Sequence, residues 1–205
     1  MDFQKLLDQA LGGIRQIGGD RKLLGKIGGG AAAAGLASLL LKKKTRNSLI
    51  KTGSAAALGA LAYHAYQNWQ QNRPADGAPL LTQNAFTQQG AEGEAAGRLI
   101  LKTMIAAAAA DGGIDEAEHS LIVQESGGDP ETQQWLAAEA CRPATPAELG
   151  QLAAGDTAAA AEAYLAARMV CAELSRKEIV FLSQLAEAFR LDPKLAEQLE
   201  RQAGF

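Results

Sequence analysis

The chain has 205 residues, of which 47% are hydrophobic and only 5% aromatic, and its formal net charge at pH 7 is −3. This near-neutral balance argues against general nucleic-acid binding, which requires a concentrated basic surface, so we expect no nucleic-acid partner. Ala is the commonest apolar residue, which favours closely packed helices over a sheet rich in β-branched and aromatic residues. We therefore predict an all-α protein that is long enough for one or two domains with a hydrophobic core.

Residues 1–17 carry an apolar stripe at helical spacing, with polar residues on the opposite side. The pattern predicts an amphipathic helix. Because few basic residues accompany the stripe, we expect a packing face rather than a helix that lies on a membrane surface. The stripe consists of Phe3, Leu6, Leu7, Ala10, Leu11 and Ile14.

Two uncharged Gly/Ala-rich runs follow, one from Ile27 to Leu41 and one from Thr52 to Tyr66, and Leu49 can lengthen the second. Each run alone is shorter than the ~20 residues that span a bilayer. Small residues recur four positions apart in both runs, which lets helices approach closely in lipid, and a basic cluster at 42–46 precedes the second run. We predict that residues 1–66 form a membrane-associated helical region, as a hairpin or a single span.

The same small-residue pattern also fits a soluble helical hairpin, or a collar that assembles with copies of itself. In that case the small-residue helix faces would make the chain a homo-oligomer. Both interpretations stay open on the sequence alone.

Residues 67–89 are rich in Gln, Asn, Pro and Gly and show no periodic apolar face, so we predict a flexible linker. Residues 90–205 then predict a domain of about seven helices, because several helix starts carry a capping signal. The expected caps are Asp115, Asp129, Thr145, Asp156 or Thr157, Ser175 and Asp192. The expected core is Trp135, Leu136, Leu149, Leu152, Tyr164, Met169, Phe181, Leu182, Leu185, Phe189, Leu195 and Leu199.

Within this domain, residues 166–186 are a weaker sequence repeat of residues 106–123. Aligning Glu118 with Glu178 places Asp115 on Ser175, so each copy predicts a helix, a tight turn and a second helix that begins with a capping box. The domain is therefore expected to hold an internal pseudo-repeat of two helical hairpins.

The acidic residues of these turns permit two interpretations. If the hairpins pack about a pseudo-twofold axis, Asp111, Asp115, Glu118 and Glu178 could converge into an oxygen-rich site for a divalent cation such as calcium or magnesium. Helix capping explains all of them except Asp111 without any ligand, and it is the interpretation we prefer.

The pattern ADG-x-I-D-x-x-E at residues 110–118, its echo x-L-S-x-x-E and the following FLSQLAEAFRLDP resemble the TerB-like superfamily, first known from tellurite-resistance proteins. The whole chain resembles the YebE-type branch, a bacterial family of unknown function described as inner-membrane proteins. The resemblance implies a helical domain over residues 88–205 and a location in the bacterial inner membrane. The resemblance favours the cytoplasmic side for the C-terminal domain, but the sequence leaves both orientations open, because basic residues stand on both sides of the first run.

For some relatives the resemblance also implies divalent-metal binding by acidic residues from both halves of the domain. The matching positions in this chain are Asp111, Asp115, Glu118 and Glu178. Cys171 stands where the second half would be expected to supply an Asp, so one hard ligand is missing.

Catalytic signatures are absent from the sequence. His64 and His119 have no nucleophile partner in a recognisable motif, and Cys141 and Cys171 lack CxxC spacing, so we expect reduced thiols and no enzyme. We interpret the chain as a membrane-associated protein with an interaction, sensing or stress-related role at the envelope and an unidentified protein partner. The alternative is a soluble, self-associating helical scaffold.

Overall fold

The computed structural model describes residues 2–17, 54–72, 80–87, 89–112, 129–171 and 174–205. Within these ranges every regular element is a helix and no strand occurs, which confirms the all-α prediction. The elements are α1 (Phe3–Ile17), α4 (Ala55–Gln71), the 3-10 helix η1 (Gln83–Phe86), α5 (Gly90–Ala109), α7 (Pro130–Cys141), α8 (Pro146–Ala153), α9 (Thr157–Val170), α10 (Arg176–Ala188) and α11 (Pro193–Ala203).

The last five helices begin where the capping signals predicted. Each cap side chain accepts hydrogen bonds from amides of the first helical turn, and these amides have no partner inside the helix. In α8 and α10 the glutamate three residues after the cap bonds back to the cap's own amide and completes a capping box. The caps are Asp129, Thr145, Asp156, Ser175 and Asp192. The cap predicted at Asp115 lies outside the described residues.

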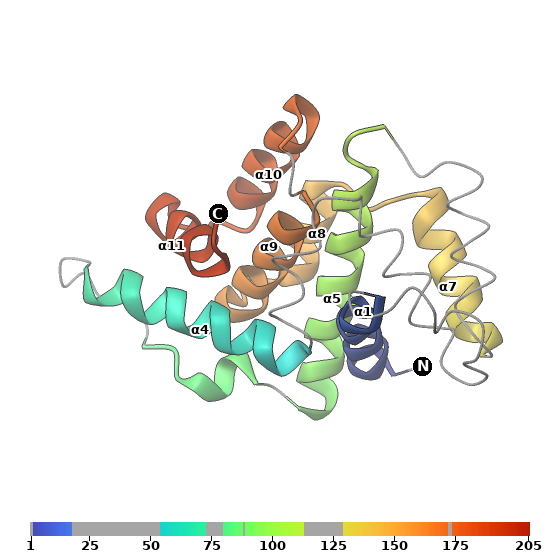
Figure 1. The fold of residues 1–205 in the computed structure, drawn as a ribbon, viewed down its shortest axis with the longest axis horizontal. Coiled ribbons are helices and arrows are strands. Elements are labelled where there is room, and N and C mark those ends of the chain that lie inside the picture. The colour runs from blue at the N-terminus through green and yellow to red at the C-terminus, as the bar shows by residue number, and fades with distance from the viewer. Residues whose placement is uncertain (1, 18–53, 73–79, 88, 113–128, 172–173) are drawn as a thin grey trace.

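Two helices, α5 and α9, pack against each other at the centre of the molecule (Figure 1). Every residue of α9 from Ala158 to Val170 is buried, and most of them are Ala. Small side chains let neighbouring helices approach closely from several directions at once. As a result, α9 also contacts α4, α8, α10, α11 and η1.

The two N-terminal helices belong to the same packed body. The helix α1 lies against α5 through Leu6, Leu7, Ala10 and Leu11, which are all buried. The backbone amide of Phe3 donates to the Glu94 carboxylate of α5, at 2.6 Å. The helix α4 packs along α11 and α9, and its start also contacts α1 (Figure 1).

The predicted inner-membrane location is corrected by the structure. No helix in the described part of the chain is long and apolar enough to cross a membrane. The second Gly/Ala-rich run forms α4, whose apolar face, including Leu58, Ala62 and Tyr66, is buried against other helices of this chain and not left for lipid. The first run, from Ile27 to Leu41, and Leu49 lie outside the described residues.

Part of the predicted linker is packed on α4. Phe86 in η1 is buried, and its ring centroid lies 5.6 Å from that of Tyr63 and 5.7 Å from that of Tyr66. Residues 73–79 and 88 are outside the described part of the chain. The division into domains stays a prediction, but the described N-terminal helices share one core with the C-terminal helices.

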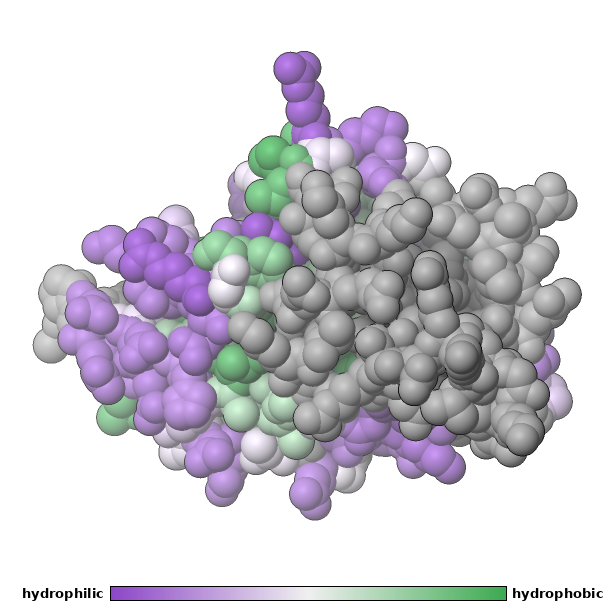
Figure 2. Space-filling view, in the orientation of Figure 1, coloured by the Kyte–Doolittle hydropathy of each residue, from purple (hydrophilic) through white to green (hydrophobic). Residues whose placement is uncertain are grey.

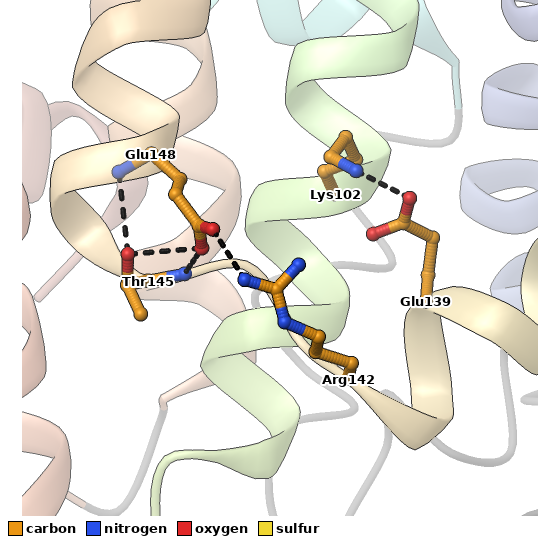
Figure 3. Close-up of polar contacts among 5 residues, drawn as sticks. All are labelled: Lys102, Glu139, Arg142, Thr145 and Glu148. Carbon is orange, nitrogen blue, oxygen red and sulfur yellow. Dashed lines mark hydrogen bonds and ion pairs between the residues drawn. The ribbon is translucent and has the colours of Figure 1, made fainter.

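The helix α7 is joined to the centre by a polar contact. Lys102 of α5 and Glu139 of α7 form an ion pair whose side chains are less than one-fifth exposed (Figure 3). Nearby, Arg142 donates to Glu148 at 2.7 Å, and Glu148 also completes the Thr145 capping box. The Arg142 side chain is largely exposed, so that pair contributes little, whereas the shielded pair tethers α7 to α5.

Contact between α4 and η1 depends on a glycine. A Cβ built on Gly59 would lie only 2.1 Å from the carbonyl oxygen of Phe86. We therefore predict that Gly59→Ala destabilises the protein by roughly 1 to 3 kcal/mol, because overpacking outweighs the gain of up to ~1 kcal/mol that Ala normally brings to a helix. Urea unfolding of the full chain measures this. The control is Gly112→Ala, since nothing lies within 4 Å of a Cβ there. A Gly59→Ala variant as stable as the wild type would contradict the close approach.

Candidate functional site

The structure places two of the four predicted metal ligands. Asp111 lies just beyond the end of α5, and Glu178 is buried in the first turn of α10. The Glu178 carboxylate accepts a hydrogen bond from the Ser175 amide at 2.7 Å, and the Ser175 hydroxyl accepts one from the Glu178 amide at 3.3 Å. Glu178 is therefore occupied as a capping residue. Asp115 and Glu118 lie outside the described residues.

A metal centre gains no support from the described ranges. They contain no group of three or more His, Cys, Asp or Glu side chains placed to hold an ion. The position where the TerB-like resemblance expects an Asp holds Cys171, which is buried between α5 and α9 with its sulfur 3.8 Å from the carbonyl oxygen of Ala107. The contact between Asp111 and α10 that the structure shows uses the Asp111 backbone carbonyl, which accepts from Lys177 at 3.2 Å.

Capping and metal binding at Glu178 predict different behaviour of two variants. Gln at the third helical position also completes a capping box, so Glu178→Gln should keep nearly wild-type stability, whereas Glu178→Ala should lose about 1 kcal/mol. Thermal unfolding of the full chain with and without millimolar calcium or magnesium measures both. A cation-dependent rise in melting temperature that Glu178→Gln abolishes would show that Glu178 is a ligand instead.

A groove of about 940 Å³ lies between the C-terminal half of α4, the start of α9 and the turn from α10 into α11. Its apolar lining includes Tyr66 and Trp69 of α4 and Leu191 and Leu195 from the other wall, all of them buried. The Tyr66 ring packs 5.4 Å from that of Trp69, and its hydroxyl accepts from the Leu81 amide at 3.5 Å. The aromatic wall is thus fixed by its own contacts.

Charged residues at this groove are mostly acidic. Four carboxylates and one guanidinium line it among the described residues, and Figure 2 shows mainly hydrophilic side chains over the part of the molecule where α4 and α11 lie. Such an excess of one charge attracts ligands of the opposite sign. The charged lining residues are Glu187, Arg190, Asp192, Glu197 and Glu200.

Glu200, whose side chain is 34% exposed, also belongs to a polar network behind the groove. It accepts a hydrogen bond from the Tyr164 hydroxyl at 2.9 Å, and the Arg168 guanidinium lies 3.7 Å away. Burial and the neighbouring Glu200 carboxylate raise the pKa of Tyr164 above its ordinary value, so this hydroxyl stays a hydrogen-bond donor. The buried Arg168 guanidinium also stacks 3.8 Å from the Phe205 ring centroid and donates to the Cys171 carbonyl.

A second, smaller cavity of about 230 Å³ lies where α1, α4, α5 and η1 meet α9. Glu162 of α9 lines it, although this side chain is only 7% exposed. Burial, with a smaller contribution from the negative charge of Asp156, raises the pKa of Glu162 to about 8. The carboxyl group is therefore mainly protonated at neutral pH.

Sequence reasoning did not identify Glu162 as a functional residue. The signal was present, because Glu162 is the only charged side chain in the run TAAAAEAYLAA. A carboxylate on an otherwise apolar helix is either exposed or a buried group that needs a partner. Only the packing of α9 on all sides decides between the two.

This burial makes stability depend on pH. In the unfolded chain Glu162 ionises near its ordinary pKa of 4.5, so between about pH 4.5 and 8 the folded state holds one proton more. Raising the pH through this window should destabilise the wild type by a few kcal/mol, at most about 5, since each pKa unit corresponds to ~1.4 kcal/mol. Above pH 8 the effect levels off.

The matched variant is Glu162→Gln, which keeps the shape and removes the ionisable group. We expect its stability to exceed that of the wild type at pH 8.5 and to approach it at pH 5. Urea unfolding at several pH values measures the difference, with the exposed Glu92→Gln as the control. Parallel pH profiles of wild type and Glu162→Gln would contradict a buried, protonated Glu162.

Comparison with known proteins identifies a family. The sequence profile of the family described as Protein of unknown function (DUF533) matches residues 26–203, which is most of the chain. The chain therefore belongs to this family. No curated protein and no solved structure matches it.

Proposed function

We propose that this member of the DUF533 family is a non-enzymatic helical protein that binds a partner protein, and that the groove between α4 and α11 receives a basic, partly apolar segment of that partner. The observation that carries the proposal is the combination of an aromatic wall with an acidic rim in one open groove of about 940 Å³. Aromatic side chains supply contact area at little entropic cost, and carboxylates favour a cationic partner.

The rim carboxylates differ in how far they are committed to the fold. Asp192 caps α11, and Glu200 is engaged by Tyr164 and Arg168. Glu187 is exposed on α10, and no hydrogen bond or ion pair within the described residues occupies its carboxylate. Glu187 is therefore the rim group best placed to meet a cation of the partner without disturbing the fold.

We also infer that residues 90–205 form a domain of the TerB-like kind and of its YebE-type branch. The pattern ADG-x-I-D-x-x-E at residues 110–118 supports this assignment, as does its echo in the Ser175 and Glu178 capping box. The role that follows from this assignment is interaction or sensing. The groove supplies the surface on which that role depends.

A peptide from this chain provides a suitable probe, because residues 41–51 read LKKKTRNSLIK and combine five cations with three aliphatic side chains. We predict that the labelled peptide binds the full chain saturably and that added salt weakens the binding. Glu187→Lys should weaken it about three- to tenfold, while the exposed Glu92→Lys, away from the groove, should not. Fluorescence anisotropy measures the affinity.

The chain's own copy of this segment could compete with the probe. A variant with Lys42, Lys43, Lys44 and Arg46 replaced by Gln removes that competition. If neither the wild type nor this variant binds the peptide, the proposed groove function is overturned. If the wild type also self-associates with rising concentration in sedimentation runs, and Glu187→Lys abolishes this, the partner is a second copy of the chain.

A further inference from the structure

Glu162 is a buried carboxyl group with no protein partner among the residues that the structure describes. Within the described residues it makes no hydrogen bond or ion pair, although only 7% of the side chain is exposed. One carboxylate oxygen lies 3.6 Å from the place that a Cβ on Gly59 would occupy, and the group lines the cavity of about 230 Å³. Because buried polar groups are generally hydrogen-bonded, a carboxyl group that faces a cavity and has no protein partner there is available to a bound group.

The walls of this cavity favour a cation. No Lys, Arg or His is among the described residues that line it, whereas Asp8 of α1 does, and Asp156 at the start of α9 acts on the Glu162 carboxyl through its charge. Neutral hydrogen-bond acceptors are available from the Thr87 hydroxyl and the Gln89 amide. No positively charged side chain among the described lining residues is present to pair with a negative ligand.

A divalent metal ion fits this cavity poorly. Calcium takes six to eight oxygen ligands, usually from several carboxylates, and magnesium demands a near-octahedral set. The described residues contain no group of three or more His, Cys, Asp or Glu side chains that could hold a metal. An ammonium group needs fewer oxygen ligands than these metal ions, because one carboxylate and two neutral oxygens satisfy its three donors.

The cavity also has room and apolar surface for a short carbon chain. Its volume is several times the ~30 Å³ that one water molecule occupies in the liquid. Leu7, Ile100 and Phe86 line it beside the polar groups, and all three side chains are buried. The lining is thus apolar along part of its wall and acidic at Glu162.

We propose that this cavity binds a small primary alkylammonium group, with the Glu162 carboxylate as its charged acceptor. The ammonium is either that of a free amine or that of a lysine side chain. This site is separate from the groove between α4 and α11, so it goes beyond the proposed partner binding and is tested independently.

Binding should be coupled to release of a proton. Among the described lining residues, the titratable groups that face the cavity are Asp8 from α1 and Glu162 itself, with Asp156 nearby, and none comes from α4, η1 or α5. Since Glu162 without a bound cation keeps its proton up to about pH 8, an ammonium must displace that proton. As the pH is raised toward 8, the apparent affinity for the ammonium should therefore increase about tenfold per pH unit. Above pH 8 it should level off.

Isothermal titration of the full chain with butylammonium chloride at pH 6, 7 and 8.5 tests the site. We expect saturable binding with one site per chain, a rise in affinity with pH and release of one proton at pH 6 and 7. Glu162→Gln should weaken binding at pH 8.5 at least tenfold, whereas the exposed Glu92→Gln should not. Butanol and magnesium chloride are the neutral and metal controls.

Several outcomes would overturn the proposal. These are no saturable binding of butylammonium at pH 8.5, equal binding by Glu162→Gln, or tighter binding of magnesium that depends on Glu162. A parallel titration with the methylamide of Nα-acetyl-lysine distinguishes the sources. Binding of both compounds supports a lysine side chain as the natural occupant, and binding of butylammonium alone supports a free amine.

Discussion

The structure depends on the burial of α9 from Ala158 to Val170. This helix has neighbours on every side, and its Ala side chains are what allow α5, α4 and α11 to approach it so closely. A helix that is surrounded in this way has no face for water, so any charged side chain on it must be accommodated inside the protein. The two buried charged side chains of α9, Glu162 and Arg168, both follow from this constraint.

The two buried ionisable side chains of α9, Arg168 and Glu162, differ in the contacts that they make within the chain. Arg168 is held by the Cys171 carbonyl, the Phe205 ring and the nearby Glu200 carboxylate, so its charge is compensated within the chain. Glu162 has no such partner among the described residues and faces a cavity. The Arg168 charge therefore has contacts within the chain, although its Nε makes no hydrogen bond among the described residues, whereas the Glu162 carboxyl group can meet a ligand in its cavity.

Packing around α9 also explains why the N-terminal helices are not independent of the C-terminal ones. Both functional candidates lie where the two parts of the chain meet, since α4 supplies Tyr66 and Trp69 to the groove, while α1 and α4 close the Glu162 cavity. Neither surface would exist in a C-terminal fragment alone. Binding at either place is thereby tied to the docking of α1 and α4.

The sequence by itself determined the helical class and the starts of the last five helices, because capping signals act within four residues of chain and need no tertiary context. It could not say which apolar faces meet: the run that ends at Tyr66 has the composition of a membrane helix, yet it is buried against α11. It also placed Leu152 in the core, where the structure leaves that side chain 40% exposed. The burial of Glu162 could not be predicted from the sequence either. Whether an apolar surface faces lipid, water or protein, and whether a carboxylate loses its solvent, depends on residues far away in the sequence, and only tertiary packing brings them together.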